Sequence, residues 1–313
     1  MELFSLLLKS RNEYGLTQAE MVEKLSLYHK VFVNLDLITY SRWERGVSMP
    51  STLRIIQLLT FAEYDVLSYL IELDLKLSKT KVNQLRRIEA LAFDQQDLIQ
   101  TSYYPVTDTR FYKYTASMPL TDLRKLALIC ESSAKFFNLT ERDVQERCER
   151  AITLQEQGAL HMLTCEGSPD YLYAHAMMSV HNEHEREQLI NEFVDFYNIP
   201  REPNISGDKI IFFHSVMKFN YRWWEFGVFH LLKLLLDDPE IKEIFMVVRD
   251  KTAEQPYISF GFEVLAEFEE ENPLAGIRKL ISISRDDYLS HHGVIAWLKE
   301  HAEFVNMPMS IEN

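Results

Sequence analysis

Apolar residues recur at helical spacing through the first seventy residues, and short polar stretches separate one group from the next. Leu3, Leu6 and Leu7 share one face of a predicted first helix. The stretches TLRIIQLLTFA and YDVLSYLIELDL show the same periodicity further along. The pattern predicts a cluster of short helices packed around a small core.

Start and stop signals divide this helical region. Thr17 stands three residues before Glu20 in LTQAEMVEKL, which is the pattern of a capping box at a helix start. Gly46 ends the stretch SRWERG, and Pro50 follows shortly after it. A further helix is expected to open at Ser51.

A longer amphipathic helix is predicted over residues 76–100. Its apolar positions lie roughly on one stripe: Val82, Leu85, Ile88 and Leu91. The segment could connect two domains or form a dimer element.

Residues beyond 105 change in character, because apolar runs typical of strands now alternate with helical stretches. Strands are expected at 110–117, 159–167, 171–181, 209–219, 241–249 and 278–284, and a short helix should run into a strand over 257–270. The stretch GSPD between the second and third strands is a hairpin signal. Helices are expected at 119–157, 185–197, 226–237 and 286–301. This order predicts an α/β (α+β) arrangement.

Length and composition fit two soluble domains. The chain has 313 residues, of which 47% are hydrophobic, enough to bury real cores. No apolar run is long enough for a transmembrane helix. The N-terminus has an acidic residue at position 2 and no basic segment before its apolar part, so it is expected to form a structural helix rather than a signal peptide. Cys130, Cys148 and Cys165 show no metal-ligand spacing, so a cytoplasmic protein without a metal is expected.

The net charge of −14 is spread unevenly. Residues 1–100 hold 12 Lys and Arg against 13 Asp and Glu, whereas residues 101–313 hold 21 against 34. An acidic surface repels phosphate backbones, so any nucleic acid is expected to bind the first part. The acidic surface could also serve only to keep the protein soluble.

The stretch ITYSRWERGVSMPS suggests what the first part does. On a helix, Tyr40 and Trp43 face one side, while serine and arginine side chains occupy the remainder. Together with LTQAEMVEKL, Gly46 and Pro50, the segment resembles the lambda-repressor-like (XRE-type) helix-turn-helix over about residues 2–70. The resemblance implies an all-helical DNA-binding domain, assigned here to residues 1–75.

In that family the third helix enters the major groove of double-stranded DNA. The positions that the resemblance assigns to the groove are Leu37, Ile38, Thr39, Ser41 and Arg42, and those that it assigns to phosphates are Thr17, Gln18, Lys30 and Arg45. The link SLYHKVFVNLDL between the two helices is several residues longer than is usual in the family. Tyr40, Trp43 and Glu44 are assigned to the fold. The alternative is a helix-turn-helix reused for protein contact.

The second part resembles the GNAT acyltransferases, chiefly over residues 209–265. The segment KIIFFHSVMKFNYRWWEFGVFHLLKLLL stands where that family has its acyl-CoA-binding strand and helix, and Tyr257 precedes a GF turn. The resemblance implies a GNAT-like domain over 105–313, joined to the first by a connector at 76–104. It assigns Tyr257 as general acid and the acyl-CoA contacts to Met217, Phe219, Arg222, Phe226, Gly227 and Val228.

The phosphate-binding motif of that family is incomplete here. Glu225 stands where a glycine amide should approach the pyrophosphate, and its carboxylate adds repulsion and bulk. No cofactor is therefore expected, and acyl-CoA would be required only if the domain is an active enzyme. Glu166, His175 and His181 could face the cleft, but none is identified as the general base.

These observations predict a transcription regulator, most simply a homodimer on two half-sites about one helical turn apart. Its GNAT-like domain would sense a small-molecule or protein effector, or mediate dimerisation. The alternative is an active N-acyltransferase that uses acyl-CoA and carries an appended DNA-binding domain. A third reading is an antitoxin-like or phage-associated regulator whose acidic domain binds a protein partner.

Overall fold

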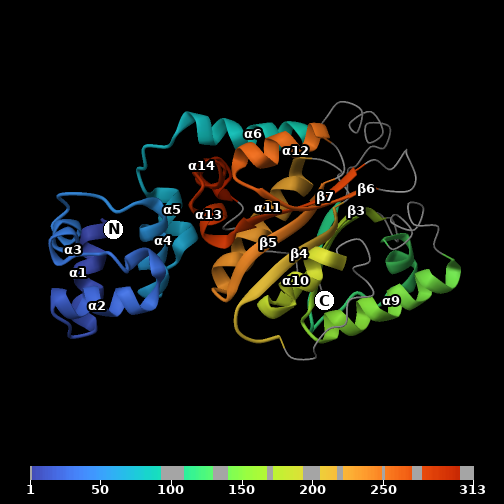
Figure 1. The fold of residues 1–313 in the computed structure, drawn as a ribbon, viewed down its shortest axis with the longest axis horizontal. Helices are drawn as coiled ribbons and strands as arrows, with labels where there is room; N and C mark the ends of the chain where they lie inside the picture. The colour runs from blue at the N-terminus through green and yellow to red at the C-terminus, as the bar shows by residue number, and fades with distance from the viewer. Residues whose placement is uncertain are drawn as a thin grey trace.

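The chain folds into a helical N-terminal region and a larger region built on one sheet (Figure 1). The computed structural model describes residues 2–92, 109–129, 140–167, 172–192, 205–216, 221–248, 251–269 and 277–303. Within these residues no helix has the length and apolar character needed to cross a bilayer.

The N-terminal helices follow the sequence signals closely. They are α1 (Leu3–Glu13), α2 (Gln18–Tyr28), the 3₁₀ turn η1 (Lys30–Phe32), α3 (Leu37–Glu44), α4 (Thr52–Phe61) and α5 (Val66–Glu72). Thr17 and Glu20 form the predicted capping box at the start of α2. Gly46 takes a positive φ of 67° just beyond α3, a conformation that glycine adopts without strain. The long link between α2 and α3 contains η1, and α3 begins at Leu37.

A seven-stranded mixed sheet forms the centre of the larger region, with the strand order β1-β2-β3-β4-β5-β7-β6. The central neighbours β4 and β5 are parallel, and the other neighbouring strands are antiparallel. The strands are β1 (Arg110–Tyr114), β2 (Leu160–Glu166), β3 (Leu172–Asn182), β4 (Lys209–Val216), β5 (Ile241–Val248), β6 (Glu263–Glu269) and β7 (Ile277–Ser284).

Successive residues of a strand point to opposite faces of the sheet. Helices cover both faces because both sets of alternating residues along the central strands are apolar. Ile211 of β4 packs into the main core, which α11 also joins, whereas Ile210 and Phe212 face a smaller core below α10. The helices of this region are α9 (Glu141–Glu156), η2 (Glu183–Glu185), α10 (Arg186–Glu192), α11 (Tyr221–Asp237), α12 (Lys251–Phe260), α13 (Arg285–Ser290) and α14 (His292–Glu300).

The α/β prediction for this region is confirmed, but several boundaries differ. Helix α11 begins at Tyr221 rather than at residue 226, and α12 already begins at Lys251. The last predicted helix is two helices, since the His291 side chain caps α14 by accepting from the Gly293 amide at 3.1 Å. The fourth predicted strand is seen as far as Val216, and its Met217 and Phe219 lie outside the described residues.

Helices α13 and α14 join the two regions. Asp286 of α13 accepts a hydrogen bond from Gln57 of α4 at 3.1 Å and lies 3.2 Å from the His29 ring. His292 accepts a hydrogen bond from the Ser78 amide at 2.9 Å, and its other ring nitrogen lies 3.4 Å from the Thr52 hydroxyl. Specific polar contacts therefore hold the N-terminal helices against the larger region.

Of the amphipathic helix predicted over 76–100, the structure shows α6 (Lys79–Ala92), while 93–100 lie outside the described residues. The middle of its apolar stripe is buried within the chain. Leu85 and Ile88 are 5% and 4% exposed, and α6 packs on α12 and α14. Dimerisation through α6 would therefore have to use another face of the helix.

Candidate functional site

Helix α3 has one buried face and one exposed face. The Asp36 carboxylate caps its start by accepting from the Thr39 amide at 2.7 Å. Tyr40 and Trp43 point inward, are 0% and 4% exposed, and meet edge-on with their ring centroids 6.4 Å apart. The assignment of these two aromatic residues to the fold is confirmed.

The other face of α3 is exposed to solvent. The helix itself lies on the side of the N-terminal region away from the sheet (Figure 1). Ile38 is 73% exposed and Leu37 46%, so two adjacent aliphatic side chains of α3 lie on the surface. Arg42 and Arg45 are also exposed, and Thr39 and Ser41 are half-buried between the two faces. The predicted groove-facing residues thus lie on one accessible helix.

Glu44 fixes α3 to the helices before it. Its carboxylate accepts hydrogen bonds from the Arg11 Nε and from the Gln18 amide group, both at 2.6 Å. The Glu44 side chain is 3% exposed and that of Arg11 16%. Gln18, which the resemblance assigned to a phosphate, therefore orients α3 in this structure.

Two other predicted phosphate contacts have neighbours of their own. The Thr17 hydroxyl accepts from the Glu20 amide, and the Glu20 carboxylate accepts from the Thr17 amide, so both groups of Thr17 serve the capping box. Lys30 is exposed, with its ammonium 3.9 Å from Asp286 of the larger region. Contacts of Thr17 and Lys30 with DNA stay predictions.

The start of α11 is occupied by carboxylates. Buried Glu225 lies 3.1 Å from the His301 ring and 3.5 Å from exposed Arg222, and Glu303 lies 4.0 Å from the same guanidinium. Burial raises the pKa of Glu225, although His301 and Arg222 oppose this shift. No local pattern indicated a role for His301 and Glu303, which follow α14.

The remaining predicted acyl-CoA contacts on α11 either are buried in the protein core or lie beyond the first turn of the helix. Phe226 is buried and stacks on Phe111 of β1 at 5.1 Å, and Val228 is also buried. Gly227 is the seventh residue of α11, beyond the first turn whose amides an anion could reach. The structure places these residues together, but not as a cradle for phosphate.

Tyr257 lies on α12 and packs edge-on against Phe262, with the ring centroids 5.4 Å apart. Burial raises the pKa of its hydroxyl to about 12. The group therefore keeps its proton near neutral pH, as a general acid must, and it also fits a packing role.

The three candidate bases differ in environment. Glu166 accepts hydrogen bonds from the Tyr114 and Thr164 hydroxyls, at 2.8 and 2.7 Å, and pairs with Lys125. His175 is 2% exposed, and burial lowers its pKa to about 4, so its ring is neutral near pH 7. His181 of β3 is completely buried and lies opposite Ile210 of β4 in the sheet. None of the three is an exposed base.

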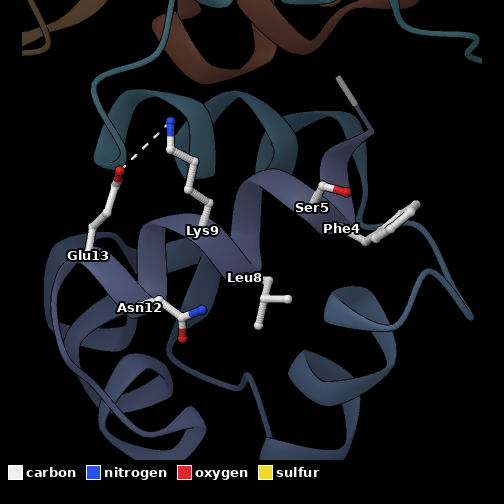
Figure 2. Close-up of a pocket in the computed structure, with 6 residues that line it drawn as sticks. All are labelled: Phe4, Ser5, Leu8, Lys9, Asn12 and Glu13. Carbon is white, nitrogen blue, oxygen red and sulfur yellow. Dashed lines mark ion pairs between the residues drawn. The ribbon is translucent and has the colours of Figure 1, made fainter.

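A hollow of about 530 Å³ runs along the outer face of α1 (Figure 2). Its lining comes from this one helix, where Phe4 and Leu8 are 38% and 43% exposed and Lys9 lies 3.7 Å from Glu13. The hollow is an open surface feature, and it brings together no residues with matching chemistry.

Metal ligands do not gather in the described part of the chain. No group of three or more His, Cys, Asp or Glu side chains could hold an ion there. Cys148 and Cys165 are both buried free thiols, and burial raises the pKa of Cys165 to about 12.

Comparison with known proteins bears only on the larger region. No family model and no curated protein matches the chain. Among solved structures, Arabidopsis thaliana NAA60 in complex with acetyl-CoA is 13% identical, with 56% of this chain and 98% of that chain covered and a TM-score of 0.36. A putative GNAT-family acetyltransferase from Desulfovibrio desulfuricans is 14% identical, with coverage of 56% and 99% and a TM-score of 0.33.

A third similar structure is the aminoglycoside N(6')-acetyltransferase of Legionella pneumophila, at 12% identity and a TM-score of 0.32 over 57% of this chain and 94% of that chain. Two of these three structures are described as acetyltransferases. At these values the likeness says nothing about activity, and it does not extend to a reading of the N-terminal helices.

Proposed function

We propose that the protein binds double-stranded DNA through α3 and acts as a transcription regulator. The observation that carries the proposal is the division of α3: Tyr40 and Trp43 are buried and anchor the helix, while Ile38 and Arg42 are exposed to solvent. A protruding helix of this kind can enter the major groove, where an arginine reads guanine and an aliphatic side chain contacts a thymine methyl.

The GNAT-like region then supplies regulation or dimerisation. It contacts the N-terminal helices through Asp286, which accepts from Gln57, and through His292, which lies 3.4 Å from the Thr52 hydroxyl, so a ligand that moves α13 or α14 would also move the helix-turn-helix. An effector bound to the larger region could thereby change DNA affinity.

The test is selection from a pool of random DNA duplexes with the intact protein and an Arg42→Ala variant. We expect the unmodified protein to enrich a short motif and the variant to lose about 1–3 kcal/mol of discrimination at one base pair. Arg87→Ala, which removes the same charge from an exposed position on α6, should leave the motif unchanged. If the unmodified protein enriches no sequence motif, the proposal that α3 recognises a DNA sequence is refuted.

A second candidate function is N-acyl transfer from acyl-CoA. It is favoured by the parallel pair β4–β5 with α11 as the crossover helix, the arrangement that the GNAT resemblance implies. The buried Glu225 carboxylate stands against it, because it would repel a pyrophosphate at the start of α11.

Replacing Glu225 with glycine is expected to tighten acetyl-CoA binding by at least about tenfold, since it removes one charge and frees His301 and Arg222 to attract phosphate. Calorimetric titration of both proteins with acetyl-CoA measures the difference. Glu146→Gly in α9 is the matched control, because it removes an exposed carboxylate from another helix. Equal affinity of the Glu225→Gly variant and the unmodified protein would show that this carboxylate is not the obstacle.

A further inference from the structure

Four polar side chains form a chain of contacts on the α10 face of the sheet. The Ser179 hydroxyl of β3 lies 2.7 Å from the His181 Nε2 and 2.8 Å from the Nε2 of His214 on β4. The His181 Nδ1 lies 3.7 Å from a carboxylate oxygen of Glu185. We call this set, His214–Ser179–His181–Glu185, the relay.

The relay runs from the interior of the protein to its surface. Ser179 and His181 are completely buried and Glu185 is 7% exposed, whereas His214 is only half-buried. The surrounding side chains are apolar, and the Phe212 ring lies 4.8 Å from the His214 ring. In such surroundings hydrogen bonds are strong and an isolated charge is costly, so a proton that enters at His214 is stabilised by moving toward Glu185.

His214 occupies a special place in the sheet. Met177 lies opposite Ser215 and Met178 opposite Phe213, so β4 has one residue more than β3 here, and that extra residue is His214. Such β-bulges re-aim side chains and are frequent beside active sites. The pairing of β4 with β5 also ends at Phe213, one residue earlier, although both strands continue.

One arrangement of protons satisfies the three contacts that link these four side chains. The His214 Nε2–H donates to the Ser179 oxygen, the Ser179 O–H donates to the His181 Nε2, and the His181 Nδ1–H faces Glu185. When His214 gains a proton on its Nδ1, its Nε2 proton can pass to Ser179 and the Ser179 proton to His181. The positive charge then rests beside the Glu185 carboxylate.

Other charged groups also lie on this face. The Arg278 guanidinium of β7 is buried, and it lies 5.6 Å from the centroid of the Phe268 ring. The Arg186 guanidinium of α10 donates to both carboxylate oxygens of Glu243 on β5, at 2.7 and 3.1 Å, and the Ser282 hydroxyl lies 3.4 Å from the same carboxylate. Because that pair is neutral as a whole, Glu185 is the carboxylate that directs the proton along the relay.

We propose that His214 is the general base of a catalytic site for acyl transfer, and that Ser179 and His181 position it and carry its proton inward. A primary amine or a water molecule would lose a proton to the His214 Nδ1 as its nitrogen or oxygen attacks the carbonyl carbon of an acyl ester or thioester. The bond from that carbon to the leaving oxygen or sulfur then breaks, and the leaving group departs with the electron pair. This function goes beyond DNA binding and rests on the second candidate only for the use of acyl-CoA as donor.

The test uses p-nitrophenyl acetate, an activated acyl ester that needs no CoA site. We expect the full-length protein to release p-nitrophenolate faster than buffer alone, more slowly in D₂O, and with a rate that rises with pH as His214 loses its proton. His214→Gln should lower the rate by at least about 10²-fold, the usual contribution of a general base. Ser179→Ala should lower it by about tenfold and move the midpoint of the pH profile, because the relay is interrupted.

His184→Gln is the matched control, since it removes an exposed imidazole three residues from His181 and outside the relay. Its rate should equal that of the unmodified protein. If His214→Gln hydrolyses the ester as fast as the unmodified protein, the proposal is overturned. Loss of DNA enrichment would not affect this result, and loss of acetyl-CoA binding would remove only the proposed donor.

A second measurement does not depend on the folding of the His214 variant. Histidine imidazole NMR of the intact protein should show the His214 and His181 rings titrating together, and Ser179→Ala should separate their midpoints. Independent titration of the two rings in the unmodified protein would overturn the relay.

Discussion

Replacing Glu44 with alanine should destabilise the N-terminal helices by about 3 kcal/mol, the low end of the cost of breaking a buried ion pair. The carboxylate holds Arg11 and Gln18 at 2.6 Å each, and without it the guanidinium stays largely buried beside no counter-charge. The expected loss of stability lies near the low end of that range because Arg11 also donates to the Leu16 carbonyl at 2.8 Å and keeps this partner in the variant.

Hydrogen exchange of peptides from α1 and α3 measures this effect locally. Glu13→Ala is the matched control, because the Glu13 side chain is 60% exposed and pairs with Lys9 on the surface. The exchange of both helices should accelerate strongly in the Glu44 variant and stay nearly constant in the control. Equal exchange in the two variants would mean that the Glu44 contacts do not hold α3 in place.

Gly293→Ala should destabilise the larger region by about 1–3 kcal/mol, the usual cost of forcing an extra group into a packed contact. A Cβ at Gly293 would lie 2.7 Å from the Lys81 carbonyl oxygen and 2.9 Å from the Leu85 Cβ. Since one of these atoms is backbone, α6 and α14 must move apart to admit the methyl group.

Gly227→Ala is the matched control, and it should leave the stability unchanged or raise it. A Cβ there would meet nothing within 4 Å, and the position lies inside α11, where alanine is favoured over glycine by about 0.5–1 kcal/mol. Thermal unfolding should therefore show a lower midpoint for Gly293→Ala and an equal or higher one for Gly227→Ala. A Gly293→Ala protein as stable as the unmodified chain would contradict the close packing of α6 on α14.

Local signals predicted most of the secondary structure correctly. Thr17 and Glu20 mark the start of α2, and Gly46 marks the stop after α3, because each acts through contacts within a few residues. The start of α11 was placed five residues too late. Its first turns are set by Trp223 and Phe226 packing on Phe111 of β1, a contact between segments more than a hundred residues apart.

The candidate sites could likewise be predicted only where they depend on residues close together in the sequence. The exposed face of α3 could be predicted, because Tyr40 and Trp43 fix which side is buried. His181 was considered as a base, but Ser179 and His214 were not, since nothing in one sequence says that β3 and β4 lie side by side in this register. The alternation of Ser179 and His181 along β3 was the only local hint that they share a face.

The acidic residues of strand β6 lie on an edge of the sheet. It is the outermost strand beyond β7 in the sheet that the described residues form, and it exposes Val264 and Phe268. An edge of this kind offers open backbone hydrogen bonds to a strand from another molecule. Glu263, Glu267 and Glu269 stand along the same strand and are exposed. Glu267 pairs with Lys279 at 2.8 Å, but two such edges would still bring Glu263 and Glu269 close to like charges, which disfavours strand pairing between two copies of the protein.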